Sequence, residues 1–140
     1  MNRRSICTVL FLAFVLQLTL QANIVVNKLD NVSANNLVYS GFLPVSDTSS
    51  DQLFFTFYGK DGVMAESDLK NSPLLIVVGA PGSSSQFINL AGMGPIVLRP
   101  DMTTAQNSDS ATAVANIMFV DLLGNGFSFV ANNSAFPTKS

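Results

Sequence analysis

Apolar and polar positions divide the chain into short apolar runs separated by loops rich in Gly, Ser and Asp. Residues 37–45 and 53–58 are rich in aromatic and branched apolar residues, and a polar segment separates them. This pattern predicts two strands joined as an antiparallel hairpin. Residues 64–69 are compatible with a short helical turn.

Two later runs, residues 74–78 and 115–121, predict strands of a different kind because their apolar residues are continuous and do not alternate with polar ones. Such runs are typical of strands that are buried on both faces, in a sheet covered by helices. Between them we expect a helix over residues 86–93, capped by Ser84 or Ser85. Residues 96–98 predict a short strand and residues 100–110 a polar loop. The order of these elements predicts an α/β fold.

The first 22 residues have the layout of a secretory signal peptide. Two arginines precede an apolar run over residues 6–20, and Ala22 offers a small residue for cleavage. The run is shorter than the roughly 20 residues that a membrane-spanning helix needs. We therefore expect a signal peptide over 1–22, one domain over 23–140, and no membrane span after cleavage. In a secreted chain, the sequons at Asn31 and Asn132 are candidate glycosylation sites.

Composition excludes several kinds of site. The chain has no histidine, and its one cysteine is Cys7, so it cannot by itself form a Ser-His-Asp or Cys-His site or a histidine-containing metal site. Residues 23–140 hold five lysines and arginines against nine acidic residues, which gives a formal charge of −4. Without a basic cluster we expect no nucleic-acid partner. We expect no metal and no cofactor.

The Gly-rich segment at residues 79–85 follows the first continuous apolar run, where α/β folds place functional sites. It lacks the Lys-Ser/Thr of a phosphate-binding loop and the three spaced glycines of a dinucleotide fingerprint. Its backbone N–H groups could stabilise an oxyanion, as similar turns do in α/β-hydrolases. The alternative is a structural turn whose serines cap the next helix.

Motifs in matching order and spacing over residues 37–129 resemble the serine carboxypeptidase family. Residues 39–45 resemble Y-S-G-Y-L-x-V, 53–58 resemble L-F-Y-W-F, 75–85 resemble L-W-L-N-G-G-P-G-C-S-S, 94–95 resemble the end of E-x-G-P, 107–121 resemble N-P-x-S-W-x-x-x-A-N-x-L-F-x-D, and 124–129 resemble G-x-G-F-S-Y. The resemblance implies the N-terminal part of an α/β-hydrolase fold, with a hairpin and buried central strands, truncated before the rest of the fold. It also implies a serine-type peptidase that releases C-terminal residues.

By this resemblance, Gly79, Ala80, Pro81 and Gly82 form an oxyanion loop. Ala80 stands where the family has a glycine that lends its N–H group. Alanine keeps that donor, but its Cβ would be strained if the backbone φ were positive. Val78 stands where the family has an asparagine that helps hold the substrate's C-terminal carboxylate, and valine has no side-chain donor.

Two further departures fall at Ser83, a family cysteine, and Gly92, a family glutamate. The family's nucleophile lies in a later G-E-S-Y-A-G turn, followed by Asp and His, and none of the three is present in these 140 residues. No catalytic residue is therefore assigned, and we expect this chain alone to be inactive.

We interpret the chain as an N-terminal fragment of a serine carboxypeptidase-like protein whose complete form acts on peptide or protein C-termini. We expect it in the secretory pathway, outside the cell or in a vacuole or lysosome. The alternative is a non-catalytic secreted paralogue that binds peptide or a protein partner, which Val78, Ala80 and Gly92 favour. A third interpretation is an unrelated β-rich secreted module, which would require alternating, half-exposed strands.

Overall fold

The structure is a computed structural model that describes residues 24–30, 32–46 and 50–131. The predicted signal peptide and both sequon asparagines, Asn31 and Asn132, lie outside the described residues. In the part that is described, no helix is long and apolar enough to span a membrane.

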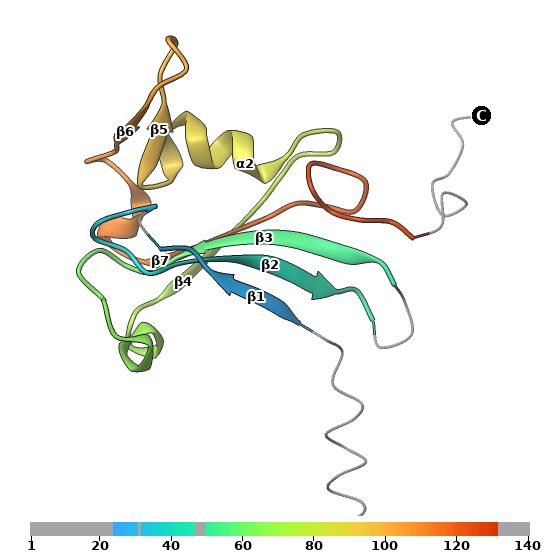
Figure 1. Ribbon diagram of the computed structural model, residues 1–140, viewed down its shortest axis with the longest axis horizontal. Coiled ribbons are helices and arrows are strands. Elements are labelled where there is room, and N and C mark those ends of the chain that lie inside the picture. Colours follow the sequence, from blue (N-terminus) through green and yellow to red (C-terminus); the bar gives the residue numbers. More distant parts are fainter. Residues whose placement is uncertain (1–23, 31, 47–49, 132–140) are drawn as a thin grey trace, which may run out of the picture.

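A mixed five-stranded sheet organises the chain, with the strand order β1-β2-β3-β7-β4 (Figure 1). Its strands are β1 (Val25–Lys28), β2 (Val38–Pro44), β3 (Gln52–Tyr58), β7 (Asn116–Val120) and β4 (Leu74–Val78). The β2–β3 pair is antiparallel, which confirms the predicted hairpin. β7 is antiparallel to β3 and parallel to β4, so β4 and β7 end at the same edge of the sheet.

Short helices and a small hairpin occupy the connections. Between β3 and β4 lies a 3₁₀ helix, η1 (Glu66–Asn71), near the expected helical turn. After β4 come α2 (Ser85–Ile88), η2 (Asn89–Met93), β5 (Ile96–Leu98), β6 (Thr104–Gln106) and η3 (Ala111–Ala113). α2 and the β5–β6 hairpin lie on one side of the main sheet (Figure 1).

The expected helix over residues 86–93 is only partly regular. Of the two serines predicted as candidate caps, Ser84 is the N-cap, because the Ser84 hydroxyl accepts a hydrogen bond from the Gln86 N–H group. After one α-helical turn the helix continues with π-helical hydrogen bonds, and at Gly92 the backbone φ is 140°. That conformation favours glycine, so the helix is distorted where glycine permits it.

Two strands were not predicted. The expected polar loop over residues 100–110 was wrong in part, because Thr104–Gln106 forms β6 against β5. β1 also went unrecognised. Both strands are short and largely exposed, so neither needs the apolar pattern on which sequence-based prediction depends.

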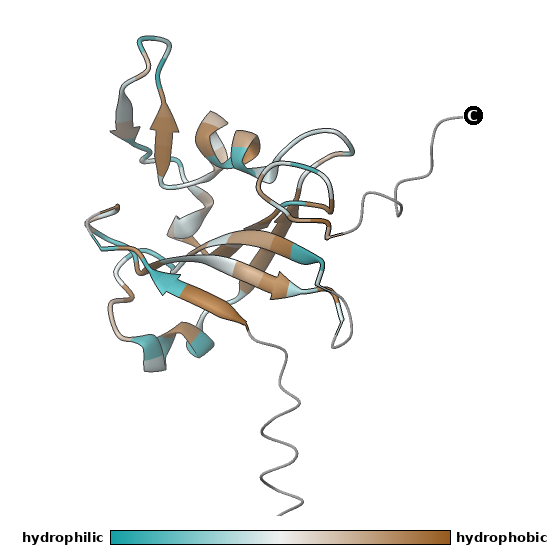
Figure 2. Cartoon of the chain, turned by 45° about the vertical axis from the view of Figure 1, so that its right-hand side comes forward, coloured by the Kyte–Doolittle hydropathy of each residue, from teal (hydrophilic) through white to brown (hydrophobic). Residues whose placement is uncertain are grey.

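The core lies between the central strands and the helices α2, η2 and η3. Val38, Tyr58, Ile117 and Phe119 form its buried cluster, and the rings of Tyr58 and Phe119 meet edge to face at 6.1 Å. Ile117 and Phe119 are fully buried, which confirms that β7 is a central strand. Hydrophobic residues lie along much of the main sheet and also on β5 and part of α2 (Figure 2).

The expectation that β4 is buried on both faces is wrong for the chain as described. Ile76 is 55% exposed and Val78 is 48% exposed, although both belong to a continuous apolar run. β4 is an edge strand here, hydrogen-bonded to β7 alone among the described strands. An apolar sequence therefore marks a strand of which the described part of the chain covers only the face that carries Val77.

Candidate functional site

The candidate site lies at the edge of the sheet where the parallel strands β4 and β7 end (Figure 1). The loop after β4, residues 79–84, leads into α2, and the loop after β7 begins at Asp121. Because parallel neighbours end together, these two loops meet, although about 40 residues separate them in the sequence.

The backbone of the first loop is fixed at its start. The Gly79 N–H group donates to the Val120 carbonyl at 3.3 Å, and the Ser83 N–H group donates to the Ala80 carbonyl at 2.9 Å. A Cβ on Gly79 would lie 2.4 Å from the Ser83 carbonyl oxygen, so this position has no room for a side chain. Gly82 has a φ of 82°, which glycine adopts without strain.

Ala80 adopts an ordinary backbone conformation. Among the described residues other than glycine, only Met102 has a positive φ, so the Ala80 Cβ is not strained. The sequence left open whether the backbone φ at this position is positive. It is not, so the turn accepts alanine without strain. Ala80 and Gly82 are exposed, and their N–H groups make no hydrogen bond to any described residue. Such N–H groups can donate to an anion.

Asp121 joins the two loops. Its Oδ1 atom accepts hydrogen bonds from the Ser84 hydroxyl at 2.8 Å, the Ser85 N–H group at 2.6 Å and the Ser85 hydroxyl at 2.8 Å. Its Oδ2 atom accepts from the Phe127 N–H group at 3.1 Å and also lies 3.0 Å from the Ser84 hydroxyl. Asp121 is fully buried, so four donor groups, from Ser84, Ser85 and Phe127, converge on one buried carboxylate.

Asp121 is ionised at neutral pH. Burial raises the pKa of this carboxyl, but the hydrogen bonds from Phe127, Ser85 and Ser84 together outweigh burial and hold the pKa below its usual value of 3.8. These donors stabilise the charged form because each directs a partial positive charge at the carboxylate.

Other polar residues of the matched motifs also tie distant segments together. Asn107 donates from Nδ2 to the carbonyls of Gly92 at 2.7 Å and Gly94 at 2.8 Å. Asn116 accepts from the Lys60 N–H group at 2.8 Å and donates to the Leu69 carbonyl at 2.7 Å. These side chains therefore hold loops in place through hydrogen bonds, which is a structural role.

Sequence reasoning did not assign a role to Asp121, Ser84 or Ser85 in joining the loops. Asp121 was one matching letter of a motif, and the serines were considered as helix caps or as part of the turn. The available signal was a carboxylate directly after a buried strand, opposite a serine-rich turn after another strand of the same sheet.

Val78, the last residue of β4, lies beside the loop and offers only an apolar side chain. An apolar cavity of about 330 Å³ also adjoins the loop. Its lining residues are Ser84, Gln86, Phe87, Leu90, Ala91 and Leu98. The surroundings of residues 79–82 therefore combine the unbonded N–H groups of Ala80 and Gly82 with apolar surface.

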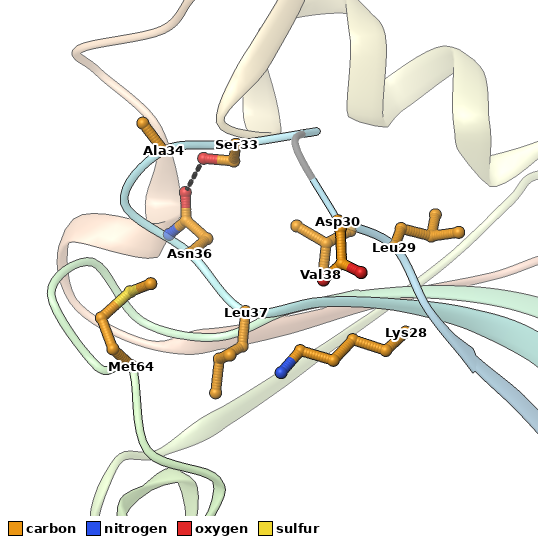
Figure 3. A pocket seen from close by; sticks show the side chains of 9 residues that line it. All are labelled: Lys28, Leu29, Asp30, Ser33, Ala34, Asn36, Leu37, Val38 and Met64. Carbon is orange, nitrogen blue, oxygen red and sulfur yellow. Dashed lines mark hydrogen bonds between the residues drawn. The ribbon is translucent and has the colours of Figure 1, made fainter.

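A second cavity, of about 600 Å³, lies where β1 ends and β2 begins (Figure 3). β2 runs in the same direction as β7, so this cavity is at the opposite edge of the sheet from the loop. Its buried amide, Asn36, donates to the Gly59 carbonyl and the Asp61 carboxylate and accepts from the Ser33 hydroxyl. No predicted site residue lines it.

Among residues 24–30, 32–46 and 50–131, no three His, Cys, Asp or Glu side chains are placed to hold a metal ion.

Comparison with known proteins supports the resemblance seen in the motifs. The family model for serine carboxypeptidases matches residues 30–140. Serine carboxypeptidase S10 family member 1 of Dictyostelium discoideum is 32% identical over 108 residues, which are 76% of this chain and 25% of that protein. The lysosomal protective protein of Mus musculus is 33% identical over 94 residues, which are 65% of this chain and 18% of that protein. The chain thus spans a quarter or less of the length of these relatives.

A solved structure gives the same result for the fold. Kex1 of Saccharomyces cerevisiae, a prohormone-processing carboxypeptidase, superposes with a TM-score of 0.58 and 24% sequence identity. The match covers 72% of this chain and 22% of that one. It confirms the predicted fold class, a partial α/β-hydrolase-like domain.

Proposed function

Because the chain belongs to the serine carboxypeptidase family, we propose that residues 79–82 form the oxyanion loop of a serine-type carboxypeptidase. The complete protein would release C-terminal residues from peptides or proteins. One observation carries this proposal: Ala80 is exposed and its N–H group has no partner among the described residues, at the position where the family resemblance expects an oxyanion donor.

The chemistry follows from that donor. When a serine attacks a peptide carbonyl, negative charge develops on the carbonyl oxygen, and fixed N–H groups stabilise it. Loss of one such donor lowers kcat by about 10²–10³-fold in enzymes of this kind. The histidine base must come from residues other than these 140, because the chain contains no histidine, and the family resemblance expects the nucleophile in a later turn.

The substrate side of the proposal is a peptide C-terminus bound beside Val78. Valine cannot donate a hydrogen bond to a carboxylate, so binding of the free C-terminus would depend on other groups of the complete protein. We therefore expect a higher KM than in relatives that keep the family asparagine at this position. No nucleic acid and no cofactor is required.

The route through the cell is also a proposal. Residues 1–22 would direct the chain into the secretory pathway, and Asn31 and Asn132 would carry glycans there. The similarity to the lysosomal protective protein supports a final location in a lysosome or vacuole, and the alternative is release from the cell.

The test begins with the native transcript, read past the codon for Ser140. We expect the frame to encode the Ser, Asp and His of the family, and the encoded protein to release the C-terminal residue of an N-blocked dipeptide. A fluorophosphonate probe should label the same protein, and the 140-residue chain, as matched control, should neither cleave nor be labelled. A product that contains all three residues and yet neither cleaves nor reacts would contradict the proposal.

A non-catalytic secreted paralogue is the second candidate. The observation that favours it is the change of residues at Val78 and Gly92, while the buried strand positions keep the family pattern. It predicts that the purified protein binds a fluorescent peptide in an anisotropy measurement and returns the peptide intact. Release of the C-terminal residue would decide against it.

A further inference from the structure

The loop that carries Ala80 has little packing of its own. Ala80, Pro81 and Gly82 are exposed, and apart from the hydrogen bonds to the Ala80 carbonyl, the contacts that hold them in the described structure lie at the two ends of the loop. At one end Gly79 is bonded to the Val120 carbonyl, and at the other Ser84 and Ser85 are bonded to the Asp121 carboxylate. The two anchoring residues, Val120 and Asp121, are consecutive and lie at the end of the buried strand β7.

We infer that Asp121 is the positioning residue of this loop: its carboxylate holds residues 84 and 85 at the end of β7 and thereby places the Ala80 N–H group. The inference rests on the proposed function in one respect: it assumes that the Ala80 N–H group donates to an oxyanion. The anchoring itself rests only on the observed contacts.

The contacts require a carboxylate and not merely a polar side chain of the same shape. All four partners of Asp121 are donors: two hydroxyl groups and two backbone N–H groups. An ionised carboxylate only accepts, whereas an asparagine amide would direct its own NH₂ group at one set of donors. No lysine or arginine of the described residues pairs with Asp121, so these dipoles alone balance its charge.

Asp121 also links the loop to its neighbour. The Phe127 N–H group donates to the same carboxylate, and the Asn125 side chain donates to the Ala80 carbonyl at 3.4 Å. The loop after β7 therefore contacts residues 79–85 through Asp121 and through Asn125. Loss of the carboxylate should loosen both loops, while residues 55–58 of β3, which pair with β7, stay ordered.

The experiment is amide hydrogen exchange, followed by NMR, on the 140-residue chain and its Asp121→Asn variant. We expect exchange at Ser83 and Ser85 to accelerate at least tenfold relative to Phe55 and Tyr58 in β3. The Ser85 amide proton should resonate at low field in the parent, because its 2.6 Å bond ends on a carboxylate, and should move upfield in the variant. Asp101→Asn is the matched control, since Asp101 also accepts hydrogen bonds within a local turn but lies in the β5–β6 connection.

Ser85→Ala provides a milder variant, because it removes one donor and keeps the carboxylate and the Ser85 N–H group. It should accelerate exchange at Ser83 and Ser85 less than Asp121→Asn does, and it decides the matter if Asp121→Asn does not fold. Equal acceleration in β3 and in the loop, or no acceleration in the loop, would overturn the inference. Neither result depends on peptide cleavage, so an inactive protein whose loop loosens as expected contradicts only the proposed function.

Discussion

A Cβ atom on Gly126 would lie 1.9 Å from Oδ2 of Asp121. The same atom would lie 2.7 Å from the Ser84 hydroxyl oxygen. Gly126 also has a φ of 54°, in the left-handed region that favours glycine. The turn after β7 thus closes against the buried carboxylate so tightly that only glycine fits.

The first prediction is that Gly126→Ala destabilises the chain by about 3 kcal/mol, as the sum of a left-handed alanine and a displaced buried carboxylate. Denaturant unfolding measures the effect. Gly62→Ala is the matched control, because Gly62 has a φ of 78° but no atom within 4 Å of its added Cβ. That control should lose only about 1 kcal/mol, the contribution of φ alone. Equal losses in the two variants would show that the carboxylate is not crowded.

The second prediction concerns acid. The pKa of Asp121 is lowered in the folded chain, so its ionised form contributes stability above the unfolded value of 3.8 and loses it as the pH falls through the lowered folded value. The difference in unfolding free energy between the parent and Asp121→Asn should be constant from pH 7 to about pH 5 and shrink below pH 4. Denaturant titrations at stepped pH measure it. A difference that shrinks between pH 7 and pH 5 would mean that the carboxyl has a raised pKa.

The sequence predicted those parts of the fold whose pattern depends on burial. The hairpin strands and β7 alternate or are apolar because they face the core. The cap was narrowed to Ser84 or Ser85 because helix starts need an N-cap. β4 has the same apolar pattern as β7, and sequence alone does not tell an edge strand from a central one. That difference depends on which strands lie beside β4, a property of the whole sheet.

The sequence predicted where the candidate site lies but not which of its residues contact one another. A Gly-rich turn after an apolar strand pointed to residues 79–85. The link to Asp121 spans 36 residues and exists only because β4 and β7 are parallel neighbours, a pairing that local pattern does not encode. Likewise, the Ala80 carbonyl accepts hydrogen bonds from the Ser83 N–H group and the Asn125 side chain, and the second contact joins segments that are far apart in the sequence.

The third prediction is that Ala80→Gly lowers the unfolding free energy by about 0.5–1 kcal/mol. Ala80 does not have a positive φ, so glycine relieves no strain there and only increases the entropy of the unfolded chain. Thermal and denaturant unfolding measure the change. Gly82→Ala, at a φ of 82° in open space, should also be destabilising, because alanine is strained at that φ. A gain in stability for Ala80→Gly would instead reveal strain at the position of the family glycine.

The last prediction concerns the exposed face and edge of β4. Leu74, Ile76 and Val78 share the face opposite Val77, which packs against the core, and all three are about half exposed. An uncharged apolar strand with an unpaired edge templates pairing with another chain, and a lysine on such a strand opposes it. We therefore expect the 140-residue chain to self-associate with rising concentration, and Ile76→Lys to shift it toward monomer in sedimentation velocity.

Phe87→Lys, which places the same charge at a 72% exposed apolar residue of α2, is the matched control and should leave the association unchanged. If both lysines reduce association equally, general surface hydrophobicity and not the β4 edge is responsible, and if Ile76→Lys has no effect, β4 is not the surface through which copies meet.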